Sequence, residues 1–380
     1  MDFSLSDHQL LIRDTVRDFM ATEVRPHVKD WEKSDYFPLD IIKKLGAMGC
    51  CGMLMPEEWG GPGLDTISYV LMIEEVARVH AAISTALAVT NSAVQLPLLA
   101  FANDEQKHRY LKPLASGEII GAFCLTEPAA GSDAAGIQAR ATRDGDNYKL
   151  SGTKTWVTNG SAAGVSIVFA KTNPEAGGKG ITAFLVEPIF PGFKVGRHED
   201  KMGQRCSPSV EIILNDCVVP VANRLGEEGQ GLKIALSALD GGRIGIAAQA
   251  VGLAQAALDE SAKFARNRKA FGKSIADFQA IQWMLADMHT EIEAARALLY
   301  QAASIKDANG KMGSAASRAK LYASEMVNRV AYKAVQIHGS QGYSRESEVE
   351  RIYRDARVIS IYEGTSEVQR TIISRDLVSK

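Results

Sequence analysis

The sequence is poor in the features that mark disulfide-rich and metal-binding proteins. Its 380 residues include only five cysteines, an odd number, and none forms a C-x-x-C pair. They are Cys50, Cys51, Cys124, Cys206 and Cys217. The seven histidines show no ligand-like spacing to them, so we expect neither a disulfide framework nor a zinc site. The pattern indicates free, mostly buried thiols in a reducing compartment.

The sequence also has no large excess of positive or negative charge and few long apolar runs. The formal net charge is -2, which gives no reason to expect nucleic acid or an anionic membrane surface as a partner. By inspection, no apolar run approaches the roughly 20 residues needed to span a bilayer. The segment Met1–Ser4 lacks the basic and apolar regions of a signal peptide. We therefore expect a cytoplasmic protein.

Several nucleotide and hydrolase motifs are missing. There is no G-x-G-x-x-G after a predicted strand, no Walker A run and no G-x-S-x-G elbow. The segment Gly226–Gly231 is glycine-rich, but its two glutamates would repel a phosphate. A Rossmann dehydrogenase, a P-loop enzyme and a serine hydrolase are all poorly supported.

The chain divides into three stretches of different character, which suits a length that allows two or three domains. Residues 1–120 have helical patterns: a capping box at Ser6–Gln9, a break at Pro26, and Gly46 as the expected C-cap of a second helix. Further helices are expected at 67–80 and 105–114, with the glycine- and proline-rich segment 55–63 irregular.

The middle stretch, 121–228, predicts a compact β-barrel-like domain. Asp144-Gly145 is a hairpin signal, and strands are expected at 165–171, 181–186 and 210–214. Residues 229–380 return to helix and predict a four-helix bundle. Two apolar stripes with 3.6-residue spacing are expected in its core: Ile281, Met284, Leu285, Met288, Ile292, Ala295 and Leu299, and then Ala323, Val327, Val330, Ala334 and Ile337.

Glu363, near the end of the chain, is the candidate catalytic base. It lies between Tyr362 and Gly364, and a carboxylate among apolar neighbours has a raised pKa and is a stronger base. Gly364 allows a ligand to approach the backbone closely. Spacing alone favours a plainer interpretation, a loop and a capped helix with Glu363 solvated.

The run I-Y-E-G-T-S-E-V-Q-R, residues 361–370, resembles the C-terminal signature of the acyl-CoA dehydrogenases, in which the Glu is the base. Three further stretches match this family in the same order: 123–128 with 131–133, 156–160, and 268–272. The resemblance covers essentially the whole chain. It implies an α+β multidomain fold with an N-terminal helical domain (1–120), a middle β-barrel-like domain (121–228) and a C-terminal four-helix bundle (229–380).

The resemblance also implies FAD as cofactor and assigns residues to it. Those expected to line the flavin are Phe123, Leu125, Thr126, Gly131, Ser132, Trp156 and Thr158. Others match residues that reach FAD from a neighbouring subunit or on its adenine side: Arg268, Phe271, Gln279, Gln336, Ile337, Gly339, Ser340, Thr365 and Glu367. The sequence departs from the family here, because His338 and Ser340 stand where an apolar residue and a glycine are common.

The acyl-CoA thioester is expected to contact Ser132, Asp240, Arg243, Tyr362 and Gly364. Arg243 has two interpretations, substrate binding or a structural ion pair. Some family members carry their base beside this arginine, but here that neighbour is Gly242, which leaves Glu363 as the matching base. No metal ligand is expected.

The implied reaction is α,β-dehydrogenation to a trans-2-enoyl-CoA, with Glu363 removing the α-proton and hydride passing to flavin N5. The resemblance further implies an electron-transferring flavoprotein as acceptor, a homotetramer of paired dimers, and a short linear, short branched or small alicyclic acyl group. An acyl-CoA oxidase or a flavin monooxygenase on the same fold is an alternative. A non-enzymatic acyl-CoA-binding scaffold is another, and would be colourless when purified.

Overall fold

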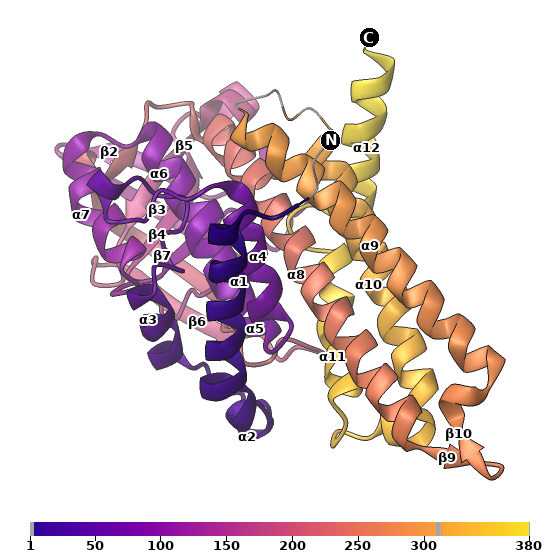
Figure 1. Ribbon diagram of the computed structural model, residues 1–380. Coiled ribbons are helices and arrows are strands. Elements are labelled where there is room, and N and C mark those ends of the chain that lie inside the picture. The colour runs from indigo at the N-terminus through magenta and orange to yellow at the C-terminus, as the bar shows by residue number, and fades with distance from the viewer. Residues whose placement is uncertain (1–3, 309–311, 313, 380) are drawn as a thin grey trace.

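The structure, a computed structural model, describes residues 4–308, 312 and 314–379. The chain folds into an N-terminal, a middle and a C-terminal part (Figure 1). A group of helices at the N-terminus packs beside a β-sheet, and long C-terminal helices form the other side of the molecule. The N-terminal helices are α1 (Asp7–Phe19), α2 (Val28–Ser34), α3 (Leu39–Ala47), α4 (Thr66–Ala77), α5 (Ala81–Ala88), α6 (Leu96–Phe101) and α7 (Asp104–Ala115).

The first helix begins as the sequence predicts, but it ends at Phe19, before the predicted stop at Pro26, and the end of the third also differs from the prediction. Ser6 and Gln9 form the expected capping box, and the break near Pro26 is a π-helical turn followed by a 3-10 turn, Arg25–His27. Gly46 lies inside α3 rather than at its C-cap, so that prediction was wrong. Glycine is needed there because a Cβ would come within 2.3 Å of the Ser116 carbonyl oxygen.

The helical stretch Ala81–Phe101 was missed by the sequence interpretation. Among the described residues it is long and apolar enough to cross a membrane, with a mean hydropathy of 1.3 over its best window, so the statement that no run approaches this length was wrong. Of that window 83% is buried inside the protein. The stretch forms α5, a π-helical turn at Val89–Gln95 and α6, and it is a core segment between the sheet and the C-terminal helices.

The middle part is an eight-stranded sheet with the order β6-β7-β3-β2-β4-β5-β8, and β1 pairs with β4. Its strands are β1 (Gly121–Cys124), β2 (Arg140–Asp144), β3 (Asn147–Thr158), β4 (Val165–Lys171), β5 (Ile181–Val186), β6 (Phe193–His198), β7 (Ser209–Pro220) and β8 (Arg224–Leu225). The predicted hairpin is confirmed, since Asp144 pairs with Asn147 and Gly145 has a φ of 59°.

The C-terminal part contains three long helices and two shorter ones: α8 (Gly231–Asn267), α9 (Gln279–Asp307), α10 (Ala315–His338), α11 (Glu348–Arg357) and α12 (Ser366–Val378). A small hairpin, β9 (Lys269–Ala270) and β10 (Lys273–Ser274), joins α8 to α9. The predicted stripe on α10 is buried throughout. On α9 the stripe is buried only from Met288 onward, and Ile281, Met284 and Leu285 are half-buried.

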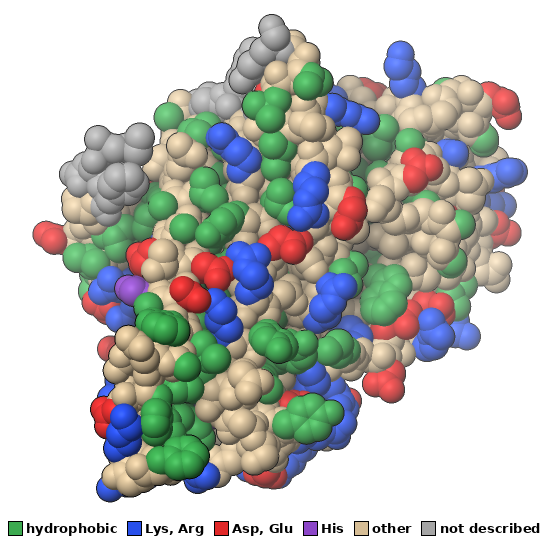
Figure 2. All heavy atoms as spheres, turned by 90° about the vertical axis from the view of Figure 1, so that its right-hand side faces the viewer, with side chains coloured by type: hydrophobic (Ala, Val, Ile, Leu, Met, Phe, Trp, Pro, Cys, Tyr) green, Lys and Arg blue, Asp and Glu red, His purple; other side chains and the backbone are tan. Residues whose placement is uncertain are grey.

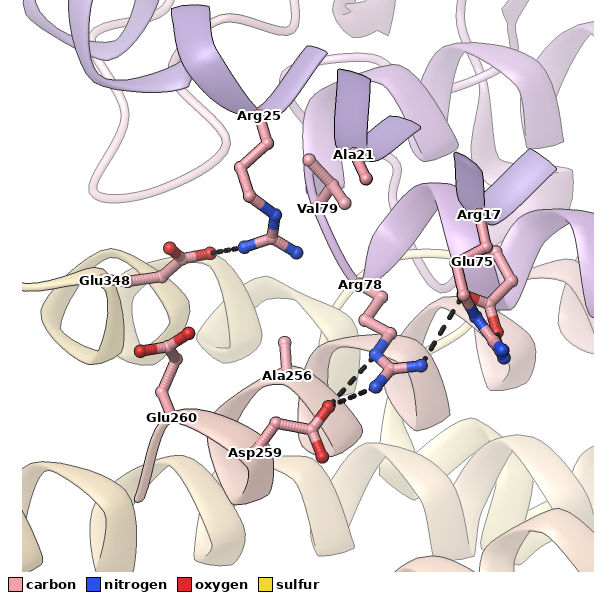
Figure 3. A pocket seen from close by; sticks show the side chains of 10 residues that line it. All are labelled: Arg17, Ala21, Arg25, Glu75, Arg78, Val79, Ala256, Asp259, Glu260 and Glu348. Carbon is pink, nitrogen blue, oxygen red and sulfur yellow. Dashed lines mark hydrogen bonds and ion pairs between the residues drawn. The ribbon is translucent and has the colours of Figure 1, made fainter. Parts of the chain in front are cut away.

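Ion pairs connect the N-terminal helices to the C-terminal ones around a polar cavity of about 200 Å³ (Figure 3). The central contact is Arg78, whose Nε donates to Asp259 of α8 at 3.1 Å. Arg17 pairs with Glu75 at 2.6 Å, and Arg25 lies 3.7 Å from Glu348 of α11. Because these charges neutralise one another, the cavity looks like a packing junction rather than a reaction site.

Candidate active site

A cleft of about 380 Å³ lies where the sheet, helix α8 and the loop before α12 meet. Half of the residues that the sequence assigned to flavin and substrate line it, together with apolar side chains of the π-helical turn Val89–Gln95 and of α8. The predicted residues on its wall are Phe123, Leu125, Thr126, Gly131, Ser132, Trp156, Thr158, Arg243, Tyr362, Glu363 and Gly364. Four segments far apart in the chain therefore converge on one cavity.

Glu363 is held in the cleft by a constrained loop. Its φ is 53°, a left-handed conformation that is uncommon outside glycine, and Gly364 follows with a φ of 86°. Two side chains hold the backbone carbonyls of this loop. Gln369 Nε2 donates to the Glu363 carbonyl oxygen at 3.2 Å, and Lys320 Nζ donates to the Gly364 carbonyl oxygen at 2.8 Å. Thr365 caps α12 by accepting from the Val368 amide.

The carboxylate of Glu363 has the properties of a base. Burial raises its pKa to about 7, against the opposing charges of Arg243 and Lys320. The residue as a whole is half-buried, but Oε2 has no exposed surface and no hydrogen-bond partner within the described part of the chain. A buried, unpaired carboxylate oxygen with a pKa near neutrality can take a proton from a ligand in the cleft.

Gly242 of α8 makes room for this carboxylate. A Cβ at position 242 would lie 2.7 Å from Glu363 Oε2, closer than side chains pack. Positions 242 and 363 thus approach the same point in space. This explains physically why a base at one of these positions leaves no room for a larger residue at the other.

Lys320 is a buried cation close to the candidate base that the sequence interpretation missed. It is fully buried on α10, and burial lowers its pKa to about 8, with Glu363 as the largest opposing influence. A signal was available, because Lys320 falls on the buried face of α10 between Ala319 and Ala323. A lysine in a core stripe is rare unless it has a partner.

Arg243 forms the predicted structural ion pair, and its substrate-binding role stays a prediction. It donates to Asp240 one turn earlier on α8, so the structural ion pair exists. Arg243 also lines the cleft, is only 6% exposed, and its Nε has no partner among the residues described. Asp240 itself does not line the cleft, and its role toward substrate stays a prediction.

The wall of the cleft that the sequence assigned to flavin is built from β3 and the loop after β1. A bulge in β3 gives Trp156 a φ of 58° and leaves its ring 58% exposed at the cleft. The Thr155 amide donates to the Thr126 carbonyl at 2.9 Å, which ties the loop to the strand. Beneath them lies a buried ion pair, Lys154 to Glu127 at 2.6 Å, which was also missed.

These residues fit an isoalloxazine ring. An exposed indole provides flat apolar cover, and the threonine and serine hydroxyls supply hydrogen-bonding partners for the polar edge. A Cβ at Gly131 would touch nothing within 4 Å, so the glycine keeps that part of the wall open. The donor set therefore suits a flavin.

Tyr362 is fixed by a buried network that sequence reasoning did not find. Gln204 Nε2 lies 3.2 Å from its hydroxyl, which also donates to Gln249 Oε1. Thr85 links the two amides, donating to Gln204 at 2.6 Å and accepting from Gln249 at 2.6 Å. Because Tyr362 precedes Glu363, this network sets the position of the candidate base.

The remaining predicted residues lie outside the cleft. Arg268, Phe271 and Gln279 are at the β9–β10 hairpin, at the lower end of the C-terminal helices in Figure 1. Gln336 and Ile337 end α10, and Gly339 and Ser340 follow in a 3-10 turn; Glu367 is exposed in the first turn of α12. Contacts to a neighbouring subunit's cofactor would have to come from this surface, and they stay predictions.

Comparison with known proteins identifies the family. Models of the N-terminal, middle and C-terminal domains of acyl-CoA dehydrogenase match residues 6–118, 122–217 and 229–378. The chain belongs to the acyl-CoA dehydrogenase family. The predicted family and three-domain fold are thereby confirmed, and the chain is an oxidoreductase acting on CH–CH bonds. A flavin cofactor and acyl-CoA dehydrogenation follow from the family.

Similar proteins cover nearly the entire chain. A short-chain specific acyl-CoA dehydrogenase of Clostridium acetobutylicum is 44% identical over 374 residues, 98% of this chain and 99% of its own. A subunit of the caffeyl-CoA reductase-Etf complex of Acetobacterium woodii is 46% identical, over 99% of both chains. The structure of butyryl-CoA dehydrogenase from Megasphaera elsdenii has a TM-score of 0.98 at 43% identity, and each chain covers 100% of the other.

Proposed function

We propose that this acyl-CoA dehydrogenase uses FAD to convert a short acyl-CoA to its trans-2-enoyl-CoA, with Glu363 as the base. The single observation that carries the proposal is the carboxylate of Glu363, a residue that lines the cleft, with an unpartnered, buried Oε2 and a pKa of about 7. Bound FAD supplies a hydride acceptor at N5 of its ring. The α-proton goes to Glu363, the β-hydrogen leaves with its electron pair, and a C=C bond forms between the two carbons.

The chain assists this step by placing charge near the reacting atoms. Arg243 and Lys320 both oppose the rise in the Glu363 pKa, so they favour the ionised form that accepts the proton. Hydrogen bonds to the thioester carbonyl would stabilise the enolate-like charge, as donors do in an oxyanion hole. Tyr362 and its amide network keep the base in place when substrate enters.

A short acyl group fits the walls and the relatives. Val89, Ala93 and Ile246 line the cleft with small aliphatic side chains from packed helices. The similar short-chain enzyme of Clostridium acetobutylicum and the butyryl-CoA dehydrogenase structure support the same class. The similar Acetobacterium woodii protein works in a complex with an Etf, which supports an electron-transferring flavoprotein as the acceptor.

Replacing the base tests the mechanism. The substitution Glu363→Gln preserves side-chain shape but cannot accept the proton, so we expect flavin reduction by substrate to slow by about 10²–10⁴. The variant should remain yellow and bind acyl-CoA. Glu105→Gln, which alters an exposed carboxylate on α7 outside the cleft, is the matched control and should keep the wild-type rate. Stopped-flow bleaching of the Glu363→Gln variant at the wild-type rate would rule out Glu363 as the base.

Acyl length tests the substrate class separately. While the pocket has room, each added methylene should contribute about 0.8 kcal/mol of burial, close to a fourfold gain in kcat/KM. Beyond that length an extra methylene must displace helix side chains, at roughly 1–3 kcal/mol. We therefore expect a sharp optimum among short linear, short branched or small cyclic acyl groups. A profile still rising at dodecanoyl-CoA would contradict the short-chain assignment and leave the role of Glu363 intact.

A further inference from the structure

Three potential metal ligands from distant parts of the chain meet away from the cleft. Glu32 comes from α2, His80 from the junction of α4 and α5, and Cys206 from the loop between β6 and β7. Their ligand atoms all lie within 4.8 Å of one another. His80 Nε2 is 3.7 Å from Glu32 Oε1, and Cys206 Sγ is 3.3 Å from the same oxygen.

The two separations that involve Glu32 match a tetrahedral metal site, and the His80 nitrogen and Cys206 Sγ lie within 4.8 Å of each other. A zinc ion binds sulfur at about 2.3 Å and nitrogen or oxygen at about 2.0 Å, which places neighbouring ligand atoms roughly 3.5 Å apart. The measured distances of 3.7 and 3.3 Å lie close to that spacing without any movement of the backbone. Imidazole, thiolate and carboxylate are also the three ligand types that zinc favours.

Three polar atoms of this cluster are buried and lack a hydrogen-bond partner in the described part of the chain, although Cys206 Sγ donates to Glu32 Oε1 at 3.3 Å. His80 is 0% exposed, and neither of its ring nitrogens has a hydrogen-bond partner in the residues that the structure covers. Glu32 Oε2 is likewise without one. The Trp31 ring packs edge-on against the imidazole at 5.9 Å and closes that side. Burying an imidazole without a partner costs free energy, and a bound metal would supply the missing partner.

The charges around the cluster are compatible with a bound divalent cation. Two arginines lie nearby. Arg351 pairs with Glu348 and Asp355 at 3.0 and 3.1 Å, and Arg354 pairs with Glu350 at 2.8 Å and, at the longer distance of 3.9 Å, with Glu32 Oε2. The Glu32 carboxylate and a Cys206 thiolate would then balance the two charges of the cation. A neutral imidazole binds metals through a ring nitrogen, and both ring nitrogens of His80 are free of hydrogen bonds among the described residues.

An ion can reach the cluster from the surface. Cys206 lines a groove of about 520 Å³ together with Arg205 and Ser207. Glu32 lines a second groove of about 430 Å³ on the other side of Arg205. Neither groove belongs to the cleft that contains Glu363, so metal and substrate would enter separately.

We propose that Glu32, His80 and Cys206 form a structural binding site for zinc or a similar divalent transition metal. On binding, the Cys206 S–H bond breaks, a sulfur–metal bond forms and the proton leaves to solvent. The ion would join the N-terminal helices to the β6–β7 loop. Gln204 lies on that loop two residues before Cys206 and contacts the Tyr362 hydroxyl. Metal binding would therefore brace the network that positions Glu363.

Sequence patterns did not predict this site, because its ligands are far apart in the chain and none has a metal-binding spacing. The expectation that no zinc site exists rested on spacing alone. Only the fold brings the three residues together.

Metal analysis of the flavin-loaded enzyme tests the proposal. After chelator treatment and dialysis against micromolar ZnCl₂, we expect about one tightly held zinc per chain, as for a three-ligand protein site. Cys206→Ser and His80→Gln should reduce this to near zero. Cys217→Ser, which removes a buried cysteine elsewhere in the middle domain, is the matched control and should retain it.

X-ray absorption at the zinc edge of the wild-type enzyme gives an independent answer if a variant fails to fold. One sulfur ligand at about 2.3 Å supports the site. A wild-type enzyme that retains no zinc would overturn the proposal. So would bound zinc with only nitrogen and oxygen ligands, or an unchanged zinc content in Cys206→Ser.

Discussion

At the scale of single residues, the active site depends on a buried pair of opposite charge. Burial raises the pKa of Glu363 to about 7 and lowers the pKa of Lys320 to about 8. The charge of each residue opposes the pKa shift of the other. The Lys320 ammonium also donates to the Gly364 carbonyl at 2.8 Å, so it acts on both the charge and the position of the base. Lys320 is a positioning residue, since it acts through Glu363.

The pH dependence of flavin reduction follows from this pair. Glu363 must be ionised to accept a proton, so the rate should rise with pH and level off above about 7. In Lys320→Met the cation that favours the ionised form is gone. The midpoint should then move to higher pH by roughly one unit, equivalent to about 1.4 kcal/mol.

Stopped-flow reduction at a series of pH values measures this midpoint. Lys333→Met, on the same helix but paired with Asp287 at 3.2 Å, is the control and should leave the midpoint in place. A loss of stability alone would lower the rate at every pH without moving the midpoint. An unmoved or lowered midpoint in Lys320→Met would show that the lysine does not favour the ionised base.

Sequence patterns could select the candidate base but not its surroundings. Glu363, Trp156 and Arg243 belong to local motifs, and the fold brings them to one cleft as expected. Gln204, Gln249 and Thr85 belong to no motif, because their roles arise only from contacts between separate domains. Lys320 lies between these cases, since its position in an apolar stripe was visible in the sequence.

At the scale of elements, strands were easier to place than helix ends. The hairpin at Gly145 and strands β4 and β5 match the expected ranges, because turn residues mark their ends on both sides. The end of α3 was wrongly predicted at Gly46 because glycine is typical both of a helix C-cap and of a position where another segment packs closely against a helix. Ala81–Phe101 was missed because an all-round apolar helix has no period to detect.

The α9 stripe shows a different limit. Its first half, with Ile281, Met284 and Leu285, has the same apolar spacing as the second half but is only half-buried. Apolar periodicity predicts which face of a helix is buried. It does not show whether the residues that pack on this face belong to the same chain or to another one. The nearby Trp283, exposed to 61%, adds to the apolar surface left at this end of the bundle.

At the scale of the whole molecule, the C-terminal helices carry an apolar surface that a single chain leaves open. Figure 2 shows hydrophobic side chains spread over this face among charged ones, including its lower end, where Figure 1 has the β9–β10 hairpin. The large exposed side chains of this part include Phe271, Trp283, Tyr332 and Tyr343. Phe271 is 96% exposed and has a φ of 51°, a costly backbone conformation for an aromatic residue without a binding partner.

We therefore predict that a second copy of the chain covers this surface and that the enzyme is a homotetramer of paired dimers. Phe271→Asp should lower the mass measured by light scattering at micromolar concentration and reduce the FAD retained on gel filtration, because Arg268 and Gln279 lie beside the same hairpin. Leu11→Asp introduces the same charge at a 63% exposed position on α1 and should change neither quantity. A wild-type enzyme that is monomeric, flavin-loaded and active would contradict the prediction, since one chain would then hold the cofactor without help from the hairpin of another.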